Sequence, residues 1–592
     1  MAAKKTSRLR SREWFDIPGD PSTTALHIER YTNFGISSEE LRSGKPIIGI
    51  AQTGSDLVPC NRIHINLALR VREGIREAGG IALEFPVHPI QETGKRPTAA
   101  LDRNLQYLGL VEVLFGYPID GVVLTIGCDK TTPALLMAAS TVDIPSICLS
   151  SGPMMNGYWK GERAGSGTIV WKARKLLATG EIDEEEFIQI VVDATTSPGF
   201  CNTMGTATTM NSLAEGLGMS LPGCAAIPAP LSERLEMSYR TGQRIVEMVK
   251  KDLTPSKILT RKAFENSIVL NSAIGGSTNA PIHINAIARH VGVELEIEDW
   301  EKVGLEIPML VNLQPGGKYL GEDFHRAGGV PAVMNALLKA GKLHDSAITV
   351  NGKTVADNYA DTTTKDTEVI RTFLKPMLEN AGFIVLKGNI FDSAVMKTSV
   401  ISDSFRSQYL DKTGSLNIFE ARAIVFEGPE DYHSRINDPQ LNIDVDCILV
   451  IRGCGPVGYP GSAEVVNMQP PDKLIREGIL ELPTLGDGRQ SGTSASPSIL
   501  NVSPESAVGG GLALLKTGDM LLIDLNQGSL DVMLDKSELQ KRHDELKTEE
   551  IENQTPWQEI YRNTVGQLSS GGIIELASKY RKIRNTIPRH SH

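Results

Sequence analysis

Thiol, carboxylate and amine side chains follow three apolar segments within the first 130 residues. Cys60 comes soon after PIIGIAQ, Glu92 soon after IALEFPVH, and Cys128, Asp129 and Lys130 directly after GVVLTIG. Apolar segments of this kind are typical of buried β-strands. Because open parallel sheets bind ligands at the carboxyl ends of their strands, we expect these five side chains to meet at one edge of a sheet. Such a meeting is typical of a site that performs chemistry.

Each of these side chains also has an ordinary structural explanation. A single cysteine is most often a small buried hydrophobic residue. Glu92 lies close in sequence to Lys95 and Arg96 and is able to form a surface ion pair, and Asp129 is able to cap the next helix. Their joint occurrence at three predicted strand ends favours a functional site over these separate explanations.

The segments that must position these side chains alternate between strands and helices. Strands are predicted at 46–52, 81–88, 121–127 and 145–151, and helices at 63–80, at 98–115 and after Pro133. In the first helix, Leu67, Val71 and Ile75 recur on one face. The alternation predicts an α/β fold with a doubly wound parallel sheet, and helical segments continue from about 170 to 345.

The character of the chain changes after residue 380. Short apolar runs separated by turn residues begin there, among them FIVLKGNI, FEARAIVFEG, CILVIRG, DMLLIDL and SLDVML. Residues 526–528 predict a hairpin turn, and the charged run 535–552 predicts a solvated helix. We therefore expect an N-terminal α/β domain over 1–380 and a β-rich, barrel-like domain over 381–592.

Composition limits the classes of partner. The net charge of −11 argues against nucleic-acid binding. The sequence has no apolar run of 18 or more residues, so no membrane-spanning helix is predicted. The basic N-terminal stretch has no apolar segment behind it, so no secretory signal is expected. The 7 cysteines are widely spaced and form no CxxC pair, which favours free thiols in a reducing compartment, most simply the cytoplasm.

Six strings between about residue 45 and residue 510 carry a family resemblance. They are DLVPCNRIH, TIGCDKTTPALLMAA, CNTMGTATTMNSLAE, IGGSTNAPIH, GPVGYPGSAEVVNM and LGDGRQSGTSAS. In these strings the chain resembles the dihydroxyacid dehydratase and phosphogluconate dehydratase family. Within that family it is most similar to the pentonate dehydratases, which act on xylonate or arabinonate.

The resemblance implies a 2Fe-2S cluster held by Cys60, Cys128 and Cys201. Three thiolate ligands leave one iron with an open position, where it is able to act as a Lewis acid. Cys454, in RGCGPVGYP, is the alternative fourth ligand. A fourth thiolate would close the cluster and limit it to electron transfer.

The resemblance also implies a divalent cation, Mg²⁺, held by Glu92, Asp129 and Glu464. Carboxylate oxygens are the ligands that Mg²⁺ prefers. Lys130 is carbamylated in the family, which turns the ammonium into an anionic oxygen ligand. The alternative for Lys130 is an ordinary salt bridge to Asp129 or Glu92.

The loop GDGRQSGTS supplies two hydroxyl groups and a guanidinium. The resemblance makes Ser491 the base that removes a proton from C2 of the substrate, with Thr493 beside it, although a serine in this setting is also typical of a turn. Arg489 is a candidate clamp for the substrate carboxylate or, equally, a structural ion-pair partner. The terminal His592 is a further candidate for substrate binding.

The function implied is the dehydration of a 2,3-dihydroxy sugar acid to a 2-keto-3-deoxy acid by a homodimer or homotetramer. One alternative is the dihydroxyacid dehydratase of branched-chain amino-acid synthesis. In that branch, however, the metal-binding glutamate usually lies in a Met-Gly-His-Glu segment, whereas Glu92 lies in QETGKRPTA. A second alternative is a sugar-acid-binding protein without catalytic activity.

Overall fold

The N-terminal half of the computed structural model is built on a parallel sheet, and the structure describes residues 9–412, 414–547 and 551–590. Four strands lie in the order β2-β1-β3-β4. Their bounds are Ile47–Gln52 for β1, Ile81–Pro86 for β2, Gly121–Ile126 for β3 and Ser146–Ser150 for β4. All neighbouring pairs in this sheet are parallel, which confirms the predicted α/β sheet.

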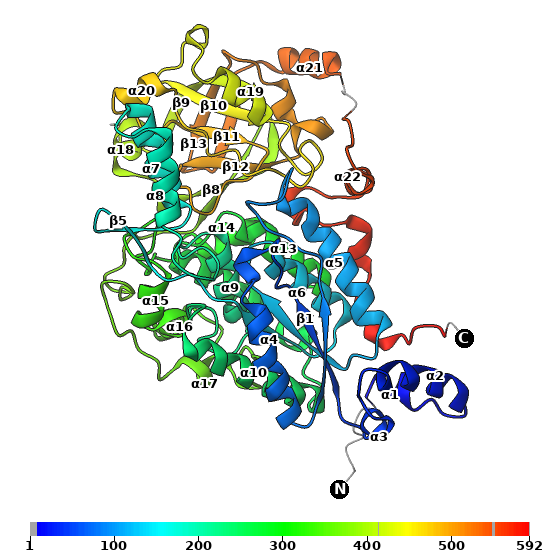
Figure 1. Cartoon of the computed structure of the whole chain (residues 1–592). Helices are drawn as coiled ribbons and strands as arrows, with labels where there is room; N and C mark the ends of the chain where they lie inside the picture. The colour runs from blue at the N-terminus through cyan, green and yellow to red at the C-terminus, as the bar shows by residue number, and fades with distance from the viewer. Residues whose placement is uncertain (1–8, 413, 548–550, 591–592) are drawn as a thin grey trace.

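Helices cover both faces of this sheet (Figure 1). The covering helices are α4 (His64–Glu77) and α10 (Ser232–Lys250) on one face, and α5 (Ala99–Gly116) and α6 (Thr131–Val142) on the other. Glycines let α4 and α10 pack backbone against backbone. A Cβ atom at Gly74 would lie 2.1 Å from the Tyr239 carbonyl oxygen, and one at Gly242 would lie 2.2 Å from that of Val71. Any larger residue at this crossing would push the two helices apart.

Helices fill the chain between the sheet and residue 360, as predicted. The main ones are α7 (Thr168–Thr179), α8 (Glu184–Asp193), α9 (Thr206–Gly216), α12 (Arg261–Ala273), α13 (Ala280–Val291), α14 (Glu298–Gly304), α15 (Gly321–Ala327), α16 (Gly329–Lys339) and α17 (Val355–Tyr359). Three short helices precede the sheet: α1 (Arg12–Phe15), α2 (Pro21–Thr32) and α3 (Ser38–Arg42). No helix in the described part of the chain is long and apolar enough to cross a membrane.

Eight strands after residue 380 close into a barrel in the order β10-β11-β12-β8-β7-β14-β13-β9. They are β7 (Phe383–Gly388), β8 (Phe391–Lys397), β9 (Ile418–Glu427), β10 (Cys447–Arg452), β11 (Thr484–Gly486), β12 (Ser498–Ser503), β13 (Met520–Asp524) and β14 (Ser529–Val532). Alternate residues of β10 face different cores: Ile448 and Val450 fill the barrel, whereas Leu449 and Ile451 join the large core shared with the N-terminal half. The predicted barrel-like fold and the hairpin between β13 and β14 are confirmed.

The last part of the chain returns to the N-terminal half. The Trp557 indole, in α22 (Pro556–Arg562), donates to the Leu101 carbonyl, and Arg103 donates to the carbonyls of Gly571 and Gly572. This segment therefore lies beside α5 (Figure 1). The domain boundary at residue 380 stays a prediction. The structure shows in addition that the C-terminal segment packs against the N-terminal half.

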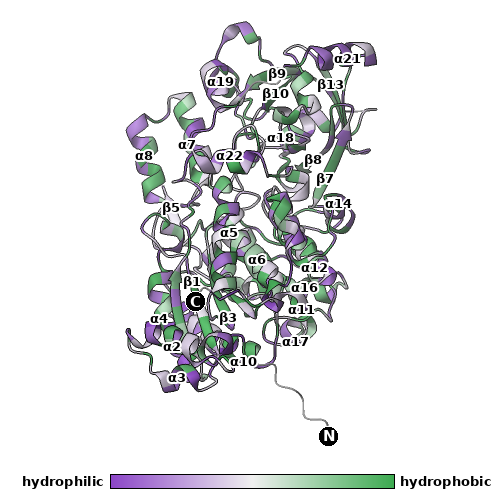
Figure 2. Ribbon diagram, turned by 90° about the vertical axis from the view of Figure 1, so that its right-hand side faces the viewer, coloured by the Kyte–Doolittle hydropathy of each residue, from purple (hydrophilic) through white to green (hydrophobic). Residues whose placement is uncertain are grey.

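The charged helix predicted over 535–552 ends earlier than expected, and residues 548–550 of that range lie outside the described residues. It is α21 (Lys536–Glu545), and Leu546 already has an extended backbone. Figure 2 shows the mainly hydrophilic residues of α21 at the outer edge of the molecule, in contrast to the hydrophobic strand β7. None of the residues of α21 is buried, so no packed face extends the helix beyond its last turn.

Candidate active site

The three predicted cluster cysteines lie together at the carboxyl edge of the sheet. Cys60 is in the turn after β1, Cys128 directly follows β3, and Cys201 precedes α9. The thiols of Cys60 and Cys128 are close enough to affect each other: their contact lowers the pKa of Cys60 and raises that of Cys128. Burial, followed by the charge of Cys60, raises the pKa of Cys201 to about 12. All three are free thiols.

Neighbouring polar groups support this thiol cluster. The Gln91 amide donates to Cys60 Sγ at 3.3 Å, and the Ser166 hydroxyl donates to Cys201 Sγ at 3.4 Å. Asn61 Oδ1 accepts the backbone N–H of Cys128 at 2.7 Å. The cluster Cys60, Cys128 and Cys201 therefore fits a group that takes three thiolate ligands. The chemistry of the donors agrees with an iron–sulfur cluster, because such clusters are held by thiolates and these three cysteines have no disulfide partners.

The other cysteines lie elsewhere. Cys148 and Cys447 are buried in β4 and β10. Cys224 is close to Cys148 and to Arg234. The backbone N–H of Cys454, the alternative fourth ligand, is held by Asp487. Within the described chain, the contacts of these four thiols involve none of the three predicted ligands.

The three predicted cation ligands form a second cluster directly beside the thiols. Oxygen atoms of Glu92, Asp129 and Glu464 all lie within 4.8 Å of one another. Glu92 and Asp129 adjoin Gln91 and Cys128 in sequence, which ties the carboxylates to the thiol cluster. Glu464 comes from the barrel half of the chain, so this site requires both halves.

Lys130 lies at the centre of the carboxylates, with a side chain that is 0% exposed. Its Nζ atom is 3.0 Å from Asp129 Oδ2, 3.1 Å from Glu92 Oε2 and 3.7 Å from Glu464 Oε1. Although burial opposes it, the three carboxylates raise the pKa of Lys130. The unmodified amine thus forms the salt bridges that the sequence left as the alternative to carbamylation.

Arg489 is the second cation of this cluster, and its five N–H donors are all engaged by the protein. Two of them bind Glu464 at 2.8 Å and Glu92 at 3.2 Å. The others bind Ser462, Asn279 and Thr98. No donor remains for a substrate carboxylate, so the geometry favours the ion-pair alternative for Arg489.

The carboxylates carry one more negative charge than the two cations offset. Burial, followed by the charge of Glu92, raises the pKa of Glu464 to about 7. Burial also acts against ionisation of Glu92, but Lys130 and Arg489 lower its pKa. Glu92 Oε2 has the Lys130 ammonium at 3.1 Å as an ion-pair partner but accepts no hydrogen bond within the described chain. Three hard oxygen donors that outnumber the two cations beside them, one of them with an oxygen that accepts no hydrogen bond, fit a divalent cation.

Ser491 and Thr493 lie in the loop that leads from β11 to β12. Their hydroxyl oxygens are 3.0 Å apart. A Cβ atom at Gly492 would lie 2.5 Å from the Thr206 backbone nitrogen, so this glycine allows the loop to approach the first turn of α9. The N-terminal end of a helix favours negative charge, including that of an ionised serine nearby.

Asn279 links the hydroxyl loop to the carboxylates and was missed by the sequence reasoning. Its amide donates to Glu464 Oε1 at 2.8 Å and to the Gln490 carbonyl at 3.2 Å. Its Oδ1 atom accepts from Arg489. The only signal was its position in the string IGGSTNAPIH, which marks a loop without naming a role.

His592 lies outside the described residues. The tail before it, from Ile587 to His590, lines a pocket with Trp14 and Thr23 of the N-terminal helices. The substrate-binding role of His592 stays a prediction.

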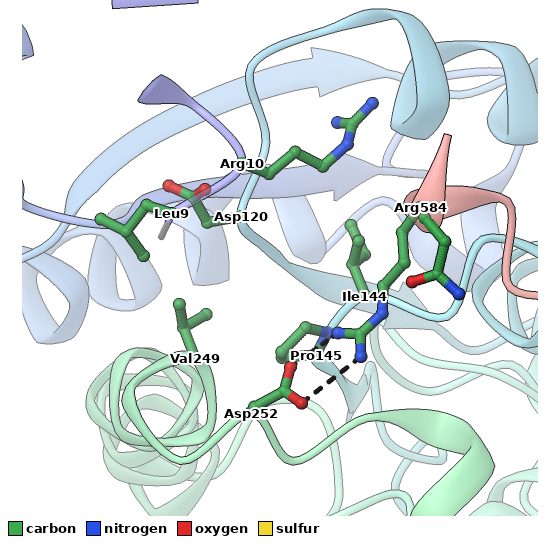
Figure 3. Close-up of a pocket in the computed structure, with 9 residues that line it drawn as sticks. Leu9, Arg10, Asp120, Ile144, Pro145, Val249, Asp252 and Arg584 are labelled. Carbon is green, nitrogen blue, oxygen red and sulfur yellow. Dashed lines mark hydrogen bonds and ion pairs between the residues drawn. The ribbon is translucent and has the colours of Figure 1, made fainter. Parts of the chain in front are cut away.

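A separate pocket of about 250 Å³ lies at the opposite, amino edge of the sheet (Figure 3). It is lined by Arg10, Asp120 and Arg584, among others. Asp120 accepts hydrogen bonds from Ser11, and Arg584 is paired with Asp252 at 2.7 Å. Because its acidic groups are paired and no thiol lines it, this pocket does not compete with the carboxyl edge as the catalytic site.

Comparison with known proteins agrees with this architecture. Residues 45–358 match the dihydroxy-acid/6-phosphogluconate dehydratase N-terminal family, and residues 368–572 match the corresponding C-terminal family. The chain belongs to the dihydroxy-acid/6-phosphogluconate dehydratase family. The similar proteins include some that are named for sugar acids and others that are named dihydroxy-acid dehydratase.

The chain is 60% identical to a D-xylonate dehydratase of Caulobacter vibrioides, over 100% of this chain and 99% of that protein. It is 44% identical to an L-arabinonate dehydratase of Rhizobium leguminosarum, over 90% of each chain. It is 37% identical to a dihydroxy-acid dehydratase of Caldanaerobacter subterraneus, over 91% of this chain and 95% of that protein. The family predicted from the sequence strings is thus confirmed.

Proposed function

We propose that the protein dehydrates a pentonate to the corresponding 2-keto-3-deoxy acid. The observation that carries the proposal is the contact between the thiol cluster and the carboxylate cluster, where Cys128 and Asp129 are adjacent and their side chains lie 3.3 Å apart. When bound, a 2Fe-2S cluster would supply a Lewis-acidic iron with an open position, and Mg²⁺ would neutralise the charge of the substrate carboxylate.

The chain itself supplies the ligands and the base. Cys60, Cys128 and Cys201 would hold the cluster, whereas Glu92, Asp129 and Glu464 would hold Mg²⁺, with Lys130 as a carbamylated further ligand. Arg489 and Asn279 keep Glu464 in place.

Ser491 removes the proton at C2, and the C3 hydroxyl departs, so that water is lost and an enol remains. The enol tautomerises to the 2-keto-3-deoxy acid. The reaction involves no net change of oxidation state, which makes it a hydro-lyase reaction. An ionised Ser491 is favoured by the hydroxyl of Thr493 and by the first turn of α9.

A cavity of about 410 Å³ next to Glu92 and Glu464 supports a polyhydroxylated substrate. Its other polar lining groups include Thr93, His433 and Tyr459, which are able to hydrogen-bond hydroxyl groups. The sugar-acid names of the relatives with 60% and 44% identity support the same choice over a branched dihydroxy acid.

Assay of C4 to C6 aldonates and of 2,3-dihydroxyisovalerate for 2-keto acid formation tests the proposal. We expect turnover of at least one pentonate and a kcat/KM lower by at least about 10-fold for the branched acid, because its apolar side chain leaves polar groups of the site unpaired. Preference for the branched acid would replace the sugar-acid assignment. An iron-loaded protein inactive on every acid would favour the non-catalytic alternative.

The assembly and the compartment belong to the same proposal. We propose a homodimer or homotetramer in a reducing, cytoplasmic setting. Light scattering of the anaerobically purified protein measures the assembly directly.

A further inference from the structure

Helices α7 and α8 form a layer with a small core of its own. Ile169, Ala173 and Ile190 are buried in this core, apart from the two larger ones. The layer lies beside the barrel, although its residues belong to the N-terminal half (Figure 1). It contacts α20 (Asp472–Arg476), where Arg476 donates to the Ala178 carbonyl. The layer is therefore held against the half of the chain that carries Ser491.

One side chain of this layer reaches the hydroxyl loop. The indole N–H of Trp171 donates to Thr493 Oγ1 at 3.0 Å. Thr493 is closely packed there, because a Cβ atom at Gly167 would lie 2.5 Å from its Cγ2 atom and one at Gly205 would lie 3.1 Å from it. The guanidinium of Arg174 lies 4.8 Å from the indole ring and packs on it. These contacts fix both partners of the hydrogen bond.

The hydrogen bond from Trp171 leaves the proton of the Thr493 hydroxyl available for a second hydrogen bond. An indole nitrogen only donates, so the Thr493 hydroxyl accepts from Trp171 and keeps its own proton for another acceptor. Within the described residues, the only other recorded partner of that hydroxyl is Ser491 Oγ at 3.0 Å. The Thr493 backbone N–H also points to Ser491 Oγ, at 3.4 Å. When Ser491 is ionised it accepts only, so the Thr493 hydroxyl would then donate to it and the donors would run from Trp171 through Thr493 to Ser491.

We propose that Trp171 is a positioning residue that sets the Thr493 hydroxyl as a donor to Ser491. Hydrogen bonds donated to an oxygen stabilise its ionised form, so this chain prepares Ser491 to accept a proton. The inference rests on the proposed function, in which Ser491 takes the C2 proton. It adds a residue from a helix that neither cluster uses.

Trp171→Phe tests the proposal, because it keeps an aromatic ring and removes the donor. We expect kcat on the preferred pentonate to fall by about 10-fold, the effect of one hydrogen bond that bears on a charged group. KM should stay within about 2-fold, since the substrate ligands are unchanged. The matched control is Trp159→Phe, because Trp159 packs against the same small core and its ring lies beside the ammonium groups of Lys160 and Lys172 rather than the hydroxyl loop. This control should keep the wild-type kcat.

A double-mutant cycle separates the donor chain from a structural role. Thr493→Val removes the middle hydroxyl, so Trp171→Phe should have no further effect in that background. Thr493→Ser should keep most of the activity. Additive effects, or a wild-type kcat in Trp171→Phe, would overturn the positioning role while leaving the proposed function intact. If the wild-type protein is loaded with iron yet inactive on all aldonates, both the positioning role of Trp171 and the proposed function are wrong.

A readout independent of activity completes the test. The chain has 5 tryptophans, so 5-fluorotryptophan labelling gives a ¹⁹F spectrum that is simple to assign with Trp171→Phe and Trp159→Phe. The Trp171 signal should shift in Thr493→Val and the Trp159 signal should not. An unmoved Trp171 signal would show that the hydrogen bond to Thr493 is absent in solution.

Discussion

Replacing either of two buried lysines should change the stability of the folded protein, but in opposite directions: loss of Lys130 should lower it and loss of Lys397 should raise it. Lys130 lies among three carboxylates, whereas Lys397 donates to the Gly275 carbonyl and has no acidic partner within the described chain. Replacing each lysine by Met keeps most of the apolar volume and removes the charge. The two variants therefore isolate the electrostatic role of Lys130 in the cation-free protein.

The distances give the size of the effect at Lys130. At an effective dielectric constant of 20, two carboxylates within 4.8 Å of each other repel by at least about 3.5 kcal/mol, and an ammonium 3.0 Å from a carboxylate attracts it by about 5.5 kcal/mol. Removing one partner of a buried ion pair typically costs about 3 to 5 kcal/mol. Because Glu464 has a pKa of about 7, it is able to take up a proton and offset part of that cost. We expect a loss of about 3 kcal/mol for Lys130→Met.

The sign for Lys397 follows from its pKa. Burial lowers the pKa of Lys397 from 10.5 to about 7, so between these values the native protein binds fewer protons than the unfolded chain. Stability therefore rises with pH across this window, and the full penalty is present below pH 7. Lys397→Met should remove a penalty of at most about 5 kcal/mol at pH 6 and about 2 kcal/mol at pH 9.

Thermal unfolding in degassed buffer with EDTA measures both effects. Lys130→Met should lower Tm by about 2 °C, because about 3 kcal/mol is spread over the large unfolding entropy of a 592-residue chain. Lys397→Met should raise Tm, more at pH 6 than at pH 9. An unchanged Tm for Lys130→Met in EDTA would refute the electrostatic account of the carboxylate cluster. A lower Tm for both variants would show that packing, and not charge, dominates at these positions.

Three further predictions concern the thiols, the base and the tail. Cys201→Ser should lose iron and the absorbance between 400 and 500 nm together, whereas Cys148→Ser should keep both; a full cluster in Cys201→Ser would remove that cysteine from the ligand set. Ser491→Ala should lose at least about 10²-fold in kcat with unchanged iron content and Tm, and near-normal turnover would move the role to Thr493 or to a metal-bound hydroxide. Deletion of the last three residues, up to His592, should raise KM or lower kcat without unfolding the protein, and unchanged kinetics would exclude a role for the tail.

Local periodicity was sufficient to predict the elements of the sheet. The helix predicted over 98–115 is Ala99–Gly116, and the strand predicted over 121–127 is Gly121–Ile126. Cys60 and Cys128 could be placed together because the carboxyl ends of parallel strands share an edge. Strand periodicity also predicted the barrel, since its short apolar runs alternate with turns.

Contacts between distant loops could not be derived from periodicity. Glu464 reaches the N-terminal carboxylates through a loop that is paired with the loop of Arg489, and only the docked halves show this. The burial of Arg489 and its five engaged donors likewise depend on partners from both halves. For the same reason, Trp171 carried no functional signal in sequence: a tryptophan on an amphipathic helix usually indicates packing alone.

The direct test of the central claim is the fate of hydrogen during turnover. D-Xylonate incubated with the iron-loaded, Mg²⁺-supplemented protein in D₂O should give a 2-keto-3-deoxy acid that has lost the C2 hydrogen and carries one solvent deuterium at C3, as observed by NMR early in the reaction. That outcome requires proton removal at C2, loss of the C3 hydroxyl and tautomerisation of an enol. Formation of no 2-keto acid from any pentonate, or of a product whose C3 carries the original C2 hydrogen and no solvent deuterium, would contradict the account.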